Sequence, residues 1–140
     1  MPTAKELSIE MDDQPGALGK ICRSLADRGV NILGFESKPA DTKGKSVVSL
    51  VVDNPTTAKS VLDSQKLRYT ETEVAQVKLP HRPGELARAA SKLGDANINI
   101  NHAYCCIDPQ TNEPILIFAT ADAGRAAKVL DEAAAAAARA

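Results

Sequence analysis

The sequence predicts an α+β protein made of two β-α-β-β-α-β units in tandem, each an antiparallel sheet with helices on one face. Two observations support this prediction: the chain repeats itself at a constant offset, and each copy shows the same succession of strand-like and helix-like hydrophobic patterns. The 140 residues suffice for one ordinary domain or two very small ones. Hydrophobic residues make up 44% and aromatic residues only 3%, so the core must be mainly aliphatic.

The internal repeat needs no gap over most of the chain. Gln14-Pro15-Gly16-Ala17-Leu18 resembles Arg82-Pro83-Gly84-Glu85-Leu86, and the offset is 68 residues (83 − 15). The same offset aligns residues 7–63 with residues 75–131. A match of this length does not follow from one chance Pro-Gly pair. We therefore divide the chain into a first unit, residues 1–72, and a second unit, residues 73–140.

Hydrophobic spacing predicts the first strand and the first helix of each unit. Leu7, Ile9 and Met11 alternate with polar residues, which is typical of a half-buried strand that Pro15-Gly16 then ends. The apolar spacing next changes to i, i+3, i+4 and i+7, which predicts an amphipathic helix. These helical positions are Leu18, Ile21, Cys22 and Leu25 in the first unit, and Leu86, Ala89, Ala90 and Leu93 in the second. Gly29 and Asn97 are expected to end the two helices in the left-handed conformation.

The rest of each unit follows the same order. Second strands are expected from residues 30–35 and 97–100, and third strands from residues 47–52 and 115–120, after polar hairpin turns. Second helices follow from about Pro55 to Gln65 and from about Ala123 onward. The first unit then has a fourth strand at residues 67–72. The offset places an Ala-rich, helix-forming run at residues 135–140, so the second unit is expected to lack its last strand and to end in a long helix. This order is the ferredoxin-like arrangement.

Composition excludes several classes of partner and site. Seventeen basic and eighteen acidic residues leave a net charge of −1, so we expect no nucleic-acid partner. The chain shows neither a signal-peptide pattern nor an apolar run long enough to span a membrane. Cys22, Cys105 and Cys106 are too few for a disulfide framework, which favours reduced thiols and a cytoplasmic location.

Metal binding and catalysis find little support in the sequence. Strand alternation puts Cys105 on the opposite face from His102 and Cys106, so these three side chains cannot converge on one metal ion. The sequence shows no convincing catalytic triad, phosphate-binding glycine loop or pair of catalytic carboxylates. We therefore expect no catalytic residues, no metal, no cofactor and no enzymatic activity.

The candidate binding site is the turn before the first helix of each unit. Gly16 and Gly84 let a ligand approach the backbone, and the helix beyond offers free N–H groups and the positive end of its dipole to a small carboxylate. Asn31 and Asn99 follow these glycines by the same interval and offer both a donor and an acceptor. The residues alone also fit a plain strand-to-helix turn, and both interpretations stay open at this point.

These motifs carry a resemblance to a known family. Asp13-Gln14-Pro15-Gly16-Ala17-Leu18 with Gly29-Val30-Asn31-Ile32 resembles the signature of ACT domains, and His81-Arg82-Pro83-Gly84-Glu85-Leu86 with Asn97-Ile98-Asn99-Ile100 resembles it again. The resemblance covers almost the whole chain and implies a stand-alone tandem-ACT protein. It implies that an amino acid or similar small molecule binds between paired units. The ligand-binding residues implied are Asp13, Gly16, Ala17, Leu18 and Asn31, and His81, Gly84, Glu85, Leu86 and Asn99.

The resemblance also implies a function and partners. We expect a regulatory amino-acid sensor of amino-acid metabolism that acts through the interfaces of its ACT units and is read by a metabolic enzyme. The alternative is an assembly module with empty sites, which mediates oligomerisation or regulates a partner enzyme. Residues 47–52 and 115–119 are apolar on both strand faces, so a homodimer or larger assembly is expected to cover part of this surface. The second loop is expected to bind a carboxylate more strongly, because Arg82 precedes it where the first loop has acidic residues.

Overall fold

A computed structural model describes residues 3–139, which form two compact units. The first unit comprises Lys5–Thr72, and the second comprises residues 73–139 together with residues 3–4. The elements in chain order are β1 (Thr3–Asp12), α1 (Ala17–Asp27), β2 (Ile32–Pro39), β3 (Lys45–Val52), α2 (Pro55–Ser64), β4 (Tyr69–Lys78), α3 (Glu85–Asp95), β5 (His102–Ile107), β6 (Pro114–Ala119) and α4 (Ala123–Arg139). None of the helices in this part of the chain is long and apolar enough to cross a membrane.

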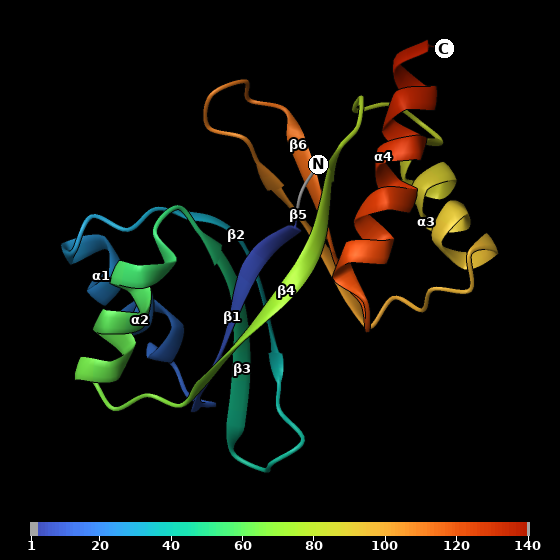
Figure 1. The fold of residues 1–140 in the computed structure, drawn as a ribbon. Coiled ribbons are helices and arrows are strands. Elements are labelled where there is room, and N and C mark those ends of the chain that lie inside the picture. The colour runs from blue at the N-terminus through green and yellow to red at the C-terminus, as the bar shows by residue number, and fades with distance from the viewer. Residues whose placement is uncertain (1–2, 140) are drawn as a thin grey trace. The chain divides into compact units, whose positions relative to one another are not determined.

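The first unit has the predicted β-α-β-β-α-β order. Its strands lie in the order β2-β3-β1-β4, and β3 pairs antiparallel with both β1 and β2. Helices α1 and α2 cover one face of these strands (Figure 1). The core on that face is aliphatic: Leu7 and Ile9 of β1 and Leu50 of β3 pack with Leu25 of α1 and Leu62 of α2.

The second unit has the order β-α-β-β-α, with strands arranged β4-β6-β5 and antiparallel pairing of β6 with both neighbours. Helices α3 and α4 cover one face of its strands (Figure 1). Its core includes residues from two strands and both helices: Val77 of β4, Phe118 of β6, Leu93 of α3 and Leu130 of α4. The expectation that this unit lacks a last strand and ends in a helix is confirmed.

Helix α4 continues well beyond the point at which its counterpart stops. It has 17 residues, whereas α2 has 10. The additional turns place Ala133 and Ala137 among the buried residues of the unit. Small side chains let this part of the helix lie close to its neighbours, so the Ala-rich run is part of the packed structure.

Strand β4 differs from the expectation. The repeat predicts a short fourth strand at residues 67–72 and a separate first strand in the second unit. The structure instead has one continuous ten-residue strand, which begins at Tyr69 in the first unit and ends at Lys78 in the second. No turn residue interrupts this segment, so the chain stays extended.

The start of the second strand in the second unit was predicted wrongly. We expected it at residues 97–100, but β5 begins at His102. Asn97 has a φ of 59°, and the N–H of Ile98 donates to the carbonyl of Leu93, so this stretch still closes the helix. The ladder starts only where the N–H of Asn101 donates to the carbonyl of Ala119. The expected left-handed helix ends are confirmed, because Gly29 has a φ of 72°.

The repeat makes a direct prediction about stability. Leu25 and Leu93 occupy equivalent positions in α1 and α3, and both are fully buried. Replacing either with Ala should lower the free energy of unfolding by about 2–5 kcal/mol, because each change removes buried methyl groups and leaves a cavity. Urea denaturation measures the loss. Arg23→Ala, on the exposed side of α1, is the control and should change stability by less than about 0.5 kcal/mol; equal costs at Leu25 and Arg23 would contradict this packing.

Candidate functional site

The turn from the first strand to the first helix is nearly identical in the two units. Gly16 and Gly84 are the N-cap residues of α1 and α3, with φ of 89° and 90°. Neither helix start has a side-chain cap. The other two helices do have one: Asn54 accepts from the N–H of Thr57, and Asp122 accepts from the N–H of Arg125, each at 3.0 Å.

A glycine N-cap leaves helix N–H groups open at the turn. In α3 the N–H of Arg88 donates to the carbonyl of Gly84 at 2.9 Å, as the first regular helical bond. Of the three N–H groups before it, that of Glu85 donates to the carbonyl of Arg82 at 3.4 Å. Those of Leu86 and Ala87 have no partner within the helix, and Gly84 has no side-chain oxygen to accept from them. Together with the helix dipole, these groups can receive a carboxylate.

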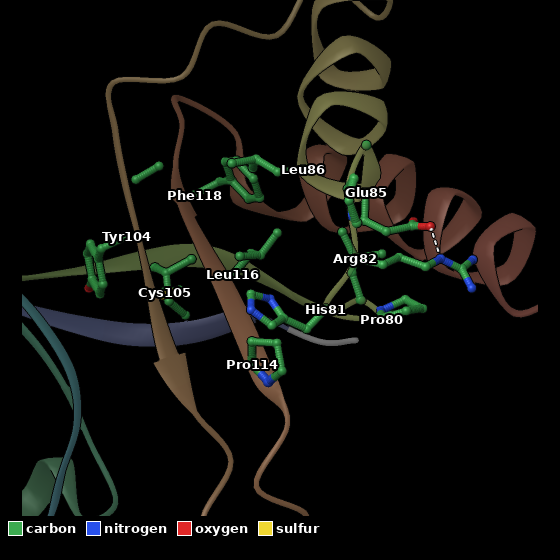
Figure 2. A pocket seen from close by; sticks show the side chains of 15 residues that line it. Pro80, His81, Arg82, Glu85, Leu86, Tyr104, Cys105, Pro114, Leu116 and Phe118 are labelled. Atoms are coloured by element: carbon green, nitrogen blue, oxygen red, sulfur yellow. Dashed lines mark hydrogen bonds and ion pairs between the residues drawn. The ribbon is translucent and has the colours of Figure 1, made fainter.

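A pocket of about 520 Å³ adjoins this turn in the second unit. Its lining comes from residues 79–86 on one side and from residues 103–105 of β5 and 114, 116, 117 and 118 of β6 on the other. Figure 2 shows Leu86, Phe118, Leu116, Cys105 and His81 around this space. The lining is predominantly apolar, and the polar groups gather at the loop. This distribution suits a small molecule with a polar head and an apolar body.

Four of the predicted site residues lie together at this pocket, and they differ in exposure. His81, Gly84 and Leu86 are exposed, and Leu86 has 57% of its surface accessible. Glu85 is only 3% exposed. Its carboxylate points toward Arg82 and away from the ring of His81 (Figure 2). The side chain of Glu85 is therefore buried beside Arg82, whereas the other three residues are exposed at the pocket.

An ion cluster holds Glu85 and Arg82 in place. The Nε of Arg82 donates to Oε1 of Glu85 at 2.7 Å, and a guanidinium nitrogen of Arg88 lies 3.4 Å from the same oxygen. Arg82 also donates to the carbonyl of Ala137 in α4 at 3.3 Å. The hydrogen bond from Arg82 holds the pKa of Glu85 below its ordinary value. We expected the charge of Arg82 to attract a ligand carboxylate. In the structure this charge is largely neutralised by the carboxylate of Glu85.

The first loop has different polar partners. Asp12 forms an ion pair with Lys45 at 2.7 Å, and Oδ1 of Asp13 accepts from the hydroxyl of Ser46 at 2.8 Å. Of the predicted residues of this loop, Ala17 lines a second pocket of about 520 Å³, whose lining also includes Gln65 and Leu67 from the segment after α2. Gly16 is exposed and Leu18 is half-buried beside it in α1.

The predicted asparagines lie away from the loops of their own units. Asn31 follows α1, and its N–H and carbonyl are both bonded to Asp53. Asn99 follows α3 and lies outside the pocket at Gly84, with its amide 3.4 Å from the side chain of Asn101. A helix of 11 residues separates each asparagine from its glycine, a distance of about 16 Å. One unit alone therefore does not bring the two parts of the predicted site together.

Comparison with known proteins identifies the repeated unit. The model of the ACT domain matches residues 5–66 and again residues 74–138. The chain belongs to the ACT-domain family. No curated protein matches it.

Solved structures show the same tandem ACT fold. Protein BT0572 from Bacteroides thetaiotaomicron superposes with a TM-score of 0.79 at 22% identity, over 93% of this chain and 88% of that one. The regulatory subunit of aspartate kinase from Thermus thermophilus gives 0.61 at 18% identity, over 94% and 92% of the chains. The corresponding subunit from Thermus flavus gives 0.60 at 17% identity, over 95% and 97%. At these identities the likeness concerns the fold.

Several pocket residues of the second ACT unit were not anticipated from the sequence. Ala103 and Cys105 pair with Phe118 and Leu116, so all four side chains stand on the helix-covered face of the sheet. Strand alternation could have placed them there, but the distance between α3 and the edge strand could not be predicted. The alternation itself is confirmed: Cys105 is exposed, whereas Cys106 is buried and pairs with Ile115.

The described part of the chain contains no cluster of side chains suited to hold a metal ion. Among residues 3–139 no group of three or more His, Cys, Asp or Glu side chains is arranged to hold an ion. Burial raises the pKa of the Cys106 thiol. A buried thiol of this kind behaves as a small apolar side chain.

The hairpin between β5 and β6 is held by Asp108. Its carboxylate accepts from the N–H of Gln110 and the hydroxyl of Thr111, each at 3.0 Å, and it forms an ion pair with Lys78 of β4. These contacts, first of all the one with Lys78, lower the pKa of Asp108 from 3.8 to about 2. The hairpin leads directly to Pro114, which lines the pocket.

Glycine at position 84 should be required by its backbone conformation. A Cβ atom there would meet no neighbour within 4 Å, so the cost of Gly84→Ala comes from the positive φ and should be about 1–2 kcal/mol. Gly94, inside α3 with an ordinary φ and equal free space, is the matched control. Gly94→Ala should stabilise the protein by about 0.5–1 kcal/mol. Thermal unfolding compares the two variants, and a loss of stability at both positions would contradict this account.

The pKa of Asp108 also predicts a pH dependence. A carboxyl whose pKa is lower in the folded state stabilises the fold above its unfolded pKa, and this contribution disappears as the pH falls through the folded value. The contribution of Asp108 should therefore be complete above about pH 4 and be lost between pH 3.8 and 2. The midpoint of urea unfolding, measured across this range for the natural protein and for Asp108→Asn, should converge at the acid end. Parallel curves would contradict the assignment.

Proposed function

We propose that this tandem ACT protein is a regulatory sensor that binds an amino acid with an apolar side chain at the His81–Leu86 loop. ACT domains are regulatory modules that bind small molecules. The observation that carries the proposal is the pocket of about 520 Å³ between the uncapped start of α3 and the apolar surface of β5 and β6. The ligand carboxylate would lie at the open N–H groups, and the apolar side chain would lie against Leu116 and Phe118.

The polar part of the pocket supports a zwitterionic head group. The imidazole of His81 lines the pocket and can either donate or accept a hydrogen bond. Because Arg82 is already paired with Glu85, recognition of the carboxylate would depend mainly on backbone N–H groups. Affinity would then be moderate, which suits a sensor that must release its ligand when the concentration falls.

The role we propose is regulation without catalysis. The two ACT matches together occupy most of the chain. Two of the similar structures are regulatory subunits of aspartate kinase, so a metabolic enzyme is a reasonable class of partner for this protein as well. Binding would act by favouring one arrangement of ACT units over another, with a coupling free energy of about 1–3 kcal/mol between sites.

A second candidate function is an assembly module with empty sites. The ion pair between Arg82 and Glu85 favours this alternative, because it explains both charged side chains of the loop by their contribution to the fold, without a ligand. On this alternative the apolar pocket would serve contacts between chains and no amino acid would bind.

Filling the pocket should separate the two functions. Cys105 lines the pocket and is exposed, so Cys105→Trp should leave the fold intact and weaken amino-acid binding by at least about tenfold, whereas Cys105→Ser should change it little. Calorimetry against each of the twenty amino acids measures affinity for the natural protein and for both variants. The matched control is Ser37→Trp, at the equivalent exposed position of the first unit.

The calorimetry can refute the proposal in two ways. If no amino acid binds to the natural protein, the assembly module becomes the better account. If an amino acid binds but Cys105→Trp has no larger effect than Ser37→Trp, the ligand lies outside the pocket of the second unit.

A further inference from the structure

The pocket of about 520 Å³ in the first unit lies beside the first turn of α1. Its lining combines four apolar side chains with four polar ones: Met11, Ala17, Ile21 and Leu67, and Asp12, Gln14, Lys20 and Gln65. Its walls are the end of β1, the loop that follows, α1 and the segment after α2. The pocket at the His81–Leu86 loop instead has one wall made by two strands. The pocket of the first unit is therefore not the counterpart of the proposed amino-acid site.

The repeat shows what occupies the equivalent place in the second unit. Ala17 lies 68 residues before Glu85 (85 − 17), and each is the first residue of its helix. Glu85 is 3% exposed, and its carboxylate accepts from Nε of Arg82 at 2.7 Å. A guanidinium nitrogen of Arg88 lies 3.4 Å from the same oxygen. The second unit thus holds a carboxylate at this place, on a side chain of its own.

The two arginines that hold this carboxylate have polar counterparts in the first unit. Gln14 is at the position of Arg82, and Lys20 is at the position of Arg88, again with the offset of 68 (82 − 14 and 88 − 20). Both counterparts line the pocket. The amide of a glutamine and the ammonium of a lysine each donate hydrogen bonds to a carboxylate. The first unit therefore has two donors at this place, whereas Ala17 supplies no carboxylate for them.

The charges of the lining leave one cation available. Asp12 lines the pocket, but its carboxylate forms an ion pair with Lys45 at 2.7 Å. The amide of Gln65 donates to the hydroxyl of Ser24 at 2.6 Å. Within residues 3–139, no ion pair engages the exposed ammonium of Lys20. A single cation beside an apolar surface suits an anion that has a short apolar chain.

We propose that this pocket binds a small carboxylate with a short apolar chain, in the place that the side chain of Glu85 occupies in the second unit. The carboxylate accepts from the ammonium of Lys20 and the amide of Gln14, and the chain lies against Ala17 and Ile21. Propionate represents this class of ligand, because it corresponds to the side chain of a glutamate. The site does not depend on amino-acid binding in the second unit.

Propionate is also the probe that tests the site. Sodium propionate is titrated against sodium chloride of equal concentration, and the backbone amide NMR signals of the protein are followed. Those of Ala17, Lys20 and Leu67 should shift and saturate with a Kd on the order of millimolar, which is reasonable for so small a ligand. Propionamide has the same shape without the charge, and it should bind at least about tenfold more weakly.

Three variants locate the bound carboxylate. Lys20→Met removes the cation and should weaken propionate binding by at least about fivefold. Arg23→Met removes a charge from the exposed side of the same helix, outside the pocket, and should bind normally. Ala17→Glu supplies a carboxylate as in the second unit and should abolish binding. The fold should accept this change, because Glu85 is accommodated at the equivalent position.

The results can overturn the proposal in several ways. Absence of a saturating shift, or equal binding of propionate and propionamide, contradicts a carboxylate site. Natural affinity in Ala17→Glu, with a circular dichroism spectrum that shows an intact fold, would place propionate outside the pocket. Equal losses in Lys20→Met and Arg23→Met would mean that only net charge matters. Cys105→Trp should bind propionate normally, so failure of amino-acid binding in calorimetry affects the proposed sensor function and leaves this site untouched.

Discussion

In both units the chain passes from its first strand into its first helix through a glycine with φ close to +90°. Other residues rarely adopt this conformation, because their Cβ atom would crowd the backbone. The turn has two consequences. It aims the helix back over the sheet, where Leu25 or Leu93 completes the core. It also leaves the helix without a side-chain cap, so that the first helix N–H donates to a loop carbonyl and the next two have no partner within the helix.

The two units use this common turn differently. In the first unit the chain leaves α2 and enters β4. In the second unit α4 continues for seven more residues than α2 and reaches the loop, where the carbonyl of Ala137 accepts from Arg82. Arg82 in turn neutralises the buried carboxylate of Glu85. A carboxylate as buried as this one requires a charged partner, so the ion pair and the long helix belong to one arrangement.

The edge strands differ in a similar way. Phe35 and Ala103 occupy equivalent positions, yet the larger residue fills space on its own edge and the smaller one leaves a pocket beside it. The two units share one framework, and the residues on the helix-covered side of the edges give each unit its own surface. The ligand proposal concerns this surface in the second unit.

The sequence by itself determined the repeated fold, because hydrophobic spacing and turn residues act locally. The transition from strand to helix is marked in each unit by a Pro-Gly pair, Pro15-Gly16 and Pro83-Gly84. The end of that helix is marked by a residue in the left-handed conformation, Gly29 or Asn97. Both signals depend on neighbouring residues only. The Ala-rich run likewise predicted the terminal helix. Part of the candidate site, His81, Gly84 and Leu86, was predicted because the turn carries its own chemistry.

Only the tertiary structure decided which of these residues share a pocket and which are used for packing. Asn99 is far from Gly84 because the rigid helix α3 separates them. Their interval in the sequence does not tell whether the chain brings them together or places them at opposite ends of the helix. Glu85 is buried and paired with Arg82, and Arg82 also donates to the carbonyl of Ala137 in α4, a contact between residues 55 positions apart. Cys105 and Leu116 line the pocket because two strands pair in one register. Such contacts depend on the packing of whole elements, and local patterns do not specify that packing.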